Sequence, residues 1–133
     1  MYFTKNLPAT LIAACIIVVG GPACWAATEA TFTELAFAAS QRQGKPVLVE
    51  IDASWCPTCA KQRPIIDHLA NEPEFKSLII YKVDFDTQKD IVREMGVRMQ
   101  STLIVFHGNA ERGRSVGDTK ESSIKALLEK AGP

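Results

Sequence analysis

The sequence predicts an α/β domain with a mixed four-stranded sheet and helices on both of its faces. Short apolar runs, typical of buried strands, alternate with longer segments whose apolar residues recur at helical spacing. The turn sequence His-Gly-Asn-Ala at 107–110 follows the third apolar run and predicts a hairpin, which adds one antiparallel strand. The resulting order, α-β-α-β-α-β-β-α, fits one sheet with helices packed on it.

The predicted elements begin with a helix from Glu29 to Gln43 and end with a helix from Thr119 to Lys130. The apolar residues of the first helix recur at helical spacing and are Phe32, Leu35, Ala36 and Ala39. Gly44 suits the position after that helix. Between the two helices, the sequence predicts strands at 47–51, 78–83, 102–106 and 112–116, helices at 58–71 and 87–95, and a short helical turn at 73–76.

Residues 1–26 have the pattern of a secretory signal peptide, which leaves residues 27–133 as the mature domain. Lys5 precedes a mostly apolar run from Leu7 to Val19, and Cys24 and Ala26 are small residues at the −3 and −1 positions of a cleavage site. The alternatives are an uncleaved membrane anchor and a lipoprotein cleavage site at Cys15. We therefore expect an exported protein, located in the periplasm if its source is a bacterium, that touches a membrane only through this segment.

Charge and cysteine content restrict the function classes. Lys plus Arg and Asp plus Glu are 15 each, so nothing indicates a nucleic-acid partner. Removal of the signal peptide would take away Cys15 and Cys24 and leave Cys56 and Cys59. One closely spaced pair makes no multi-disulfide scaffold, and its loop is too small to stabilise folding much. Reactivity is the better explanation for this pair.

The two cysteines lie in the motif Trp55-Cys56-Pro57-Thr58-Cys59, between the first predicted strand and the second predicted helix. The first thiol would then lie near unpaired backbone N–H groups and the positive end of the helix dipole, which favour the reactive thiolate. Pro57 fits the first helical position, where no N–H is needed. Half of a zinc site and a plain disulfide are the alternatives for this spacing.

This motif and its surroundings resemble the thioredoxin family, over roughly Thr31 to Lys130. Glu50 lies six residues before Cys56, where the family has a buried acid, usually Asp. Pro64 matches the proline that kinks the family's active-site helix, and Lys82 matches the lysine partner of the buried acid. The similarity is greatest to the reducing members, including the C-terminal domain of DsbD-type disulfide reductases. The resemblance implies a thioredoxin-like fold and no cofactor.

The resemblance also assigns roles. Cys56, expected to be partly exposed, attacks a disulfide, and the more buried Cys59 resolves the mixed disulfide. Glu50 is a candidate proton acceptor for Cys59, because burial raises a carboxyl pKa; a buried ion pair with Lys82 is the structural alternative. Trp55 and Pro57 would border the substrate site.

Ser101 stands where the family has a cis-proline. In the family the residue before that proline pairs with the substrate backbone, and here it is Gln100. We expect an all-trans Met99-Gln100-Ser101 segment, because a cis bond before a non-proline residue costs about 3–4 kcal/mol. A changed loop near the thiols would alter substrate exchange or ease metal capture.

Together these observations predict an exported thiol–disulfide oxidoreductase that reduces disulfide-containing proteins. Its electrons would come from a membrane donor of the DsbD type, since an oxidising compartment offers no soluble reducing pool. The alternatives are a module that binds a soft metal or an iron–sulfur cluster through Cys56 and Cys59, and a non-catalytic interaction domain with a structural disulfide. No metal ligand beyond the two cysteines is predicted.

Overall fold

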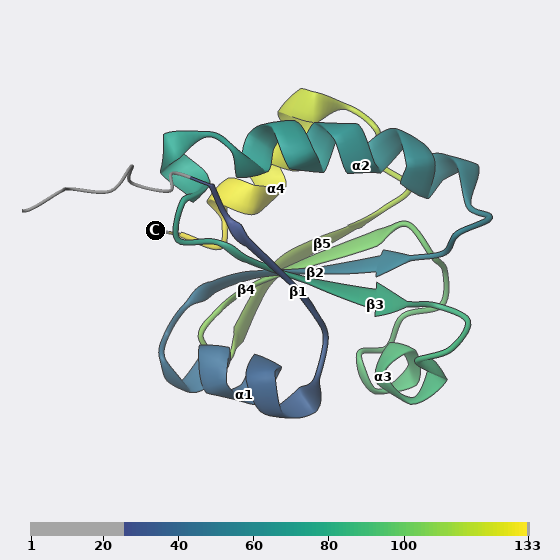
Figure 1. The fold of residues 1–133 in the computed structure, drawn as a ribbon, viewed down its shortest axis with the longest axis horizontal. Coiled ribbons are helices and arrows are strands. Elements are labelled where there is room, and N and C mark those ends of the chain that lie inside the picture. Colours follow the sequence, from purple (N-terminus) through teal and green to yellow (C-terminus); the bar gives the residue numbers. More distant parts are fainter. Residues whose placement is uncertain (1–25, 133) are drawn as a thin grey trace, which may run out of the picture.

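The computed structural model describes residues 26–132, which form one five-stranded sheet with helices on both faces (Figure 1). The predicted signal peptide lies outside the described residues, apart from Ala26. The strands are β1 (Thr28–Thr31), β2 (Pro46–Asp52), β3 (Ile79–Asp84), β4 (Thr102–His107) and β5 (Ala110–Val116). The helices are α1 (Glu34–Arg42), α2 (Pro57–Ala70), the 3₁₀ turn η1 (Pro73–Phe75), α3 (Lys89–Glu94) and α4 (Glu121–Glu129).

The sheet order is β1-β3-β2-β4-β5, with β2 in the centre. β1 and β2 pair with β3 in parallel, whereas β4 is antiparallel to both β2 and β5. The central strand is buried on both faces, as its apolar composition predicts. Leu48 packs in the core under α2 and α4, and Val47, Val49 and Ile51 pack in the core that includes Phe32 and Val92. Glu50 is therefore the one charged side chain among the buried residues of this strand.

The first predicted helix is wrong over its first residues. Thr28–Thr31 is a strand, β1, which pairs with the outer edge of β3, and α1 begins only at Glu34. Thr33 starts the helix because its Oγ1 accepts a hydrogen bond from the Ala36 N–H at 3.2 Å. The described residues therefore form five strands and not the predicted four.

The packing of α1 also differs from its predicted apolar spacing. Leu35 is 78% exposed, and Phe37 makes the contact with the sheet instead. Its ring lies 5.2 Å from the ring of Phe106, between centroids, with an edge-to-face orientation. Gly44 follows the helix with φ of +66°, a conformation that glycine adopts without steric cost, as predicted.

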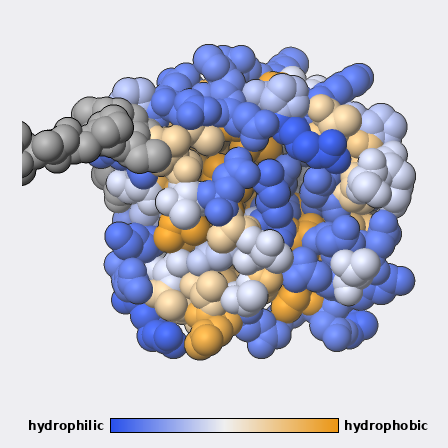
Figure 2. All heavy atoms as spheres, in the orientation of Figure 1, coloured by the Kyte–Doolittle hydropathy of each residue, from blue (hydrophilic) through white to orange (hydrophobic). Residues whose placement is uncertain are grey.

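The other predicted elements are confirmed, with bounds that shift by at most two residues. α2 begins at Pro57, in the first helical position, and runs through Pro64 without ending. The helix pairs α2/α4 and α1/α3 lie on opposite sides of the sheet (Figure 1). Hydrophilic side chains cover most of the face seen in Figure 2, with apolar side chains in small groups between them. No helix within the described residues is long and apolar enough to cross a membrane.

Candidate active site

Cys56 and Cys59 form a disulfide at the start of α2, with 5.3 Å between their Cα atoms. Cys56 is the N-cap residue of the helix, and its Sγ accepts a hydrogen bond from the Cys59 N–H at 3.1 Å. The sulfur thus occupies the place that a serine or aspartate oxygen takes in an ordinary cap. The predicted position of the first sulfur, at unpaired N–H groups of a helix terminus, is confirmed.

The predicted difference in exposure between the two cysteines is wrong for this disulfide form. Cys56 is 2% exposed and Cys59 is 1% exposed. Both pack with Ala53 in a small apolar cluster, against which Phe85 also lies. Because the side chain of Cys56 turns inward to cap the helix and to reach Cys59, the disulfide is covered from solvent.

Glu50 is two residues from Leu48 and so lies on the same face of β2, the face that α2 covers, and its side chain is buried, with 2% exposure. Its Oε1 has no hydrogen-bond partner among the described residues. Desolvation by burial raises the pKa of the Glu50 carboxyl from its ordinary value of 4.5 to about 7, although the positive charge of Lys82 acts in the opposite direction. Glu50 is therefore a buried acid that changes its protonation state near neutral pH.

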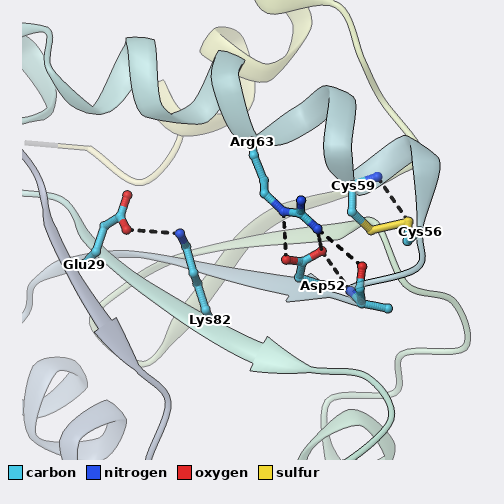
Figure 3. A network of polar contacts seen from close by, with 7 residues as sticks. Glu29, Asp52, Cys56, Cys59, Arg63 and Lys82 are labelled. Atoms are coloured by element: carbon cyan, nitrogen blue, oxygen red, sulfur yellow. Dashed lines mark hydrogen bonds and ion pairs between the residues drawn. A yellow bond between two sulfur atoms is a disulfide. The ribbon is translucent and has the colours of Figure 1, made fainter.

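The predicted ion pair between Glu50 and Lys82 is absent from the described residues. Lys82 lies beside Glu50 in the β2–β3 register, but its Nζ binds the Oε2 of Glu29 at 3.0 Å (Figure 3). Glu29 belongs to β1, the strand that the sequence did not predict. Since β1 brings a carboxylate within reach of Lys82, the ammonium pairs with Glu29 and not with the buried acid.

A second ion pair near the disulfide was also not predicted. Arg63 donates two hydrogen bonds to Asp52 from one side of its guanidinium group, from Nε to Oδ2 at 3.0 Å and from Nη2 to Oδ1 at 3.1 Å (Figure 3). Arg63 also donates to the Ala53 carbonyl at 3.4 Å. This pair joins the middle of α2 to the end of β2 and so fixes the loop that leads into the motif. The sequence signal for this pair is weak: it consists only of two opposite charges, Asp52 and Arg63, eleven residues apart on either side of a strand–helix junction.

Trp55 is 58% exposed, as expected for a residue bordering the site. Its Nε1–H donates to the Oδ2 of Asp86 at 2.7 Å, so the indole is held by the segment that follows β3. No local pattern predicts this contact, because Trp55 and Asp86 come from different loops. Pro57 is exposed at the first position of the helix.

The segment before β4 is trans throughout, as predicted, since the described residues contain no cis peptide bond. Ser101 has φ of +58° and is the only non-glycine residue with positive φ among those described. The left-handed conformation costs an L-residue about 1–2 kcal/mol. The Ser101 N–H donates to the Ile51 carbonyl at 2.8 Å, and its Oγ donates to the Gln100 carbonyl at 2.5 Å. The strained residue is therefore tied to the end of β2, at the edge of the sheet where α2 and its cysteines begin.

Gln62 is a buried polar residue near the cysteines that was not predicted. It lies on the inner face of α2 with Cys59 and Ile66, and it is 1% exposed. Its Nε2 donates to the carbonyls of Ser101 and Asp118. A glutamine inside the apolar stripe of a helix was the signal that could have identified it. The described residues contain no group of three or more His, Cys, Asp or Glu side chains that could hold a metal ion.

Known proteins share this architecture. A family model described as Thioredoxin matches residues 26–130. Thioredoxin Asp f 29 of Aspergillus fumigatus is 32% identical over 89 residues, which cover 65% of this chain and 81% of the relative. Thioredoxin 1 of Nostoc sp. is 32% identical over 85 residues, which cover 64% and 78%. The crystal structure of Trxlp from Edwardsiella tarda is 37% identical, with a TM-score of 0.73, and the match covers 77% of this chain and 98% of that one.

The family match extends over nearly all of the described residues and includes the cysteine pair at the start of α2. The pair can exchange between dithiol and disulfide, and disulfide-containing proteins are the substrates that the family implies. The chain therefore belongs to the thioredoxin family and is a thiol–disulfide oxidoreductase.

Proposed function

We propose that this protein is an exported reductant of protein disulfides. The observation that carries the chemistry is the Cys56–Cys59 pair at the N-terminus of α2, where the Sγ of Cys56 accepts the Cys59 N–H. A sulfur held at a helix N-terminus is stabilised as thiolate, which is both the attacking and the leaving form in disulfide exchange.

In the reducing direction, the Cys56 thiolate attacks one sulfur of the substrate disulfide and releases the other as a thiolate. The thiol of Cys59 loses its proton and attacks the Sγ of Cys56, which releases the second substrate thiol. Two electrons pass to the substrate, and the protein is left with the Cys56–Cys59 bond. A dithiol donor must then reduce that bond to complete the cycle.

Glu50 is the proposed acceptor of the Cys59 proton, directly or through one water. Its unpaired Oε1 is buried under α2, and its pKa of about 7 matches proton transfer at neutral pH. A carboxyl with its ordinary pKa of 4.5 would be a weaker base there. Gln100 and Ser101, together with Trp55 and Pro57, form the proposed substrate-binding border.

Export is supported by the N-terminal sequence pattern, which predicts cleavage after Ala26 or retention as an anchor. In an oxidising compartment, the electrons would come from a membrane donor, for which the DsbD type is the proposed class. N-terminal sequencing of the protein recovered from the exported fraction tests whether the protein is exported and cleaved. A mature chain that begins at Ala27 is expected, and recovery only from the cytosol would contradict export.

The function is tested by the reduction potential of the Cys56–Cys59 couple and by turnover of insulin with dithiothreitol as donor. We expect a potential in the range of soluble reductants, about −230 to −270 mV, and catalysis that the Cys56→Ser substitution abolishes. A potential below about −300 mV without turnover would instead indicate a structural disulfide. Metal bound by the reduced protein would support the metal-binding alternative.

A further inference from the structure

Gln62 is an unusual residue for its position on α2. It lies one turn beyond Cys59, on the stripe of the helix that faces the sheet, and only 1% of it is exposed. A buried amide is destabilising unless it finds hydrogen-bond partners. Its partners therefore explain why it is tolerated.

The amide of Gln62 joins two loops that are distant in the sequence. Its Nε2 donates to the Asp118 carbonyl at 2.8 Å and to the Ser101 carbonyl at 3.3 Å. The Ser101 carbonyl also accepts the Gly117 N–H at 2.9 Å. The segment before β4 and the segment after β5 are thus held to each other and to the helix that carries both cysteines.

The segment before β4 and the end of β5 carry exposed apolar side chains next to the reactive end of the sheet. Met99 and Val116 are each 54% exposed, and they line one shallow groove of about 240 Å³. Ser101 ties this groove to the end of β2 through its bond to the Ile51 carbonyl. A protein substrate that presents a disulfide to Cys56 would lie against such surfaces, whereas a small disulfide would reach the sulfurs without them.

We infer that Gln62 is a positioning residue that fixes the Met99–Ser101 and Val116–Asp118 segments relative to the cysteines and thereby sets affinity for protein disulfides. This inference rests on the proposed function. The amide neither touches substrate nor moves a proton, so its loss acts on substrate binding and leaves the thiol chemistry unchanged.

The experiment compares Gln62→Met, which keeps length and removes both donated bonds, with Lys61→Met on the exposed face of the same helix. KM and kcat are measured with insulin and with the small disulfide 5,5′-dithiobis(2-nitrobenzoate). Gln62→Met should raise KM for insulin about three- to tenfold, the range of one or two hydrogen bonds, with kcat and the small-disulfide rate unchanged. Lys61→Met should behave as wild type. An equal loss on both substrates, or no change in KM, would overturn the inference.

A second variant, Gln62→Glu, gives a pH readout. Its carboxyl can donate to a carbonyl when protonated but repels both carbonyls when ionised. Its KM for insulin, relative to wild type at the same pH, should therefore rise with pH, while the ratio for Gln62→Met stays flat. A flat ratio for both variants would contradict the inference. If Gln62→Met fails to fold, the rise in KM of Gln62→Glu between low pH, where its carboxyl donates, and high pH, where it does not, provides the test by itself.

Amide hydrogen exchange separates this inference from the proposed function. In Gln62→Met, the N–H groups of Ser101 and Gly117 should exchange faster. The carbonyls of Ser101 and Asp118 lose the hydrogen bonds from Gln62 that order the two segments. If the wild type reduces neither disulfide, the proposed function is wrong. Unchanged exchange at both amides would overturn the positioning role whether or not the wild type is active.

Discussion

Lys82 lies beside Glu50 in the parallel register of β2 and β3, yet its ammonium binds Glu29 at 3.0 Å. The buried carboxyl is left with an unpaired Oε1, and Lys82 acts on it only through its charge. Burial raises the pKa of Glu50 most, and the neighbouring charges then act in opposite directions. Lys82 lowers the pKa, whereas Asp52 and Glu29 raise it.

The first prediction follows from these opposed charges. Lys82→Met should raise the pKa of Glu50 above its wild-type value of about 7, because the attractive charge is removed. Glu29→Gln should lower it, since one repulsive charge is removed and Lys82 loses its partner. The pKa is read from an NMR titration of the Glu50 side-chain carboxyl carbon. Lys89→Met, on α3, is the matched control, and a shift of the same sign in both test variants would contradict the assignment.

The second prediction concerns the pH dependence of stability. The pKa of Glu50 is about 7 in the folded protein and 4.5 as its ordinary value, so between these pH values the folded state holds one proton more than the unfolded state. Stability is therefore lost as pH rises through this window, by about 3 kcal/mol in total. Glu50→Gln does not titrate and should lack this loss.

Urea unfolding of both proteins at pH 4.5 and pH 8 measures the effect. The free energy of unfolding of Glu50→Gln relative to wild type should increase by about 3 kcal/mol from the lower to the higher pH. Measuring the difference between the two proteins cancels the titration of groups that they share. A difference that is constant with pH would mean that Glu50 titrates with an ordinary pKa.

The third prediction concerns the left-handed backbone of Ser101. Ser101→Gly and Ser101→Ala both remove the hydroxyl, but only glycine adopts φ of +58° without steric cost. The glycine variant should be the more stable of the two by about 1 kcal/mol, measured by thermal or urea unfolding. Equal stabilities would show that the site relaxes out of the left-handed region.

Ser101→Pro should be the most damaging change at this position. Proline fixes φ near −65° and cannot donate the hydrogen bond that now joins the Ser101 N–H to the Ile51 carbonyl. We expect a loss of about 3 kcal/mol or more. A variant with wild-type melting temperature and faster insulin turnover would show that the loop can adopt the proline conformation of the family.

The fourth prediction distinguishes the two cysteines. After reduction, Cys56 should be alkylated before Cys59, because its sulfur is the helix cap and lies next to the solvent-exposed Trp55. Mass mapping after brief treatment with iodoacetamide gives the order. Cys59→Ser should trap a mixed disulfide on Cys56, whereas Cys56→Ser should trap none. Preferential labelling of Cys59 would reverse the assigned roles.

Local patterns in the sequence were enough to predict most of the helices and strands. The alternation of apolar runs and helical spacing located every helix and four of the five described strands. Pro57 and Gly44 marked a helix start and a helix end, because each restricts or permits backbone angles within a single residue. The position of the cysteine pair at a strand–helix junction followed from the same local signals.

The contacts that shape the site were set by segments far apart in the chain. β1 reads locally as the start of a helix, and its pairing with β3, some fifty residues away, gives Lys82 a partner other than Glu50. Gln62 reaches the Ser101 and Asp118 carbonyls across 39 and 56 residues, and the +58° φ of Ser101 is held by its bond to Ile51. Hydrogen bonds and ion pairs of this kind depend on strand order and register, which no window of neighbouring residues contains.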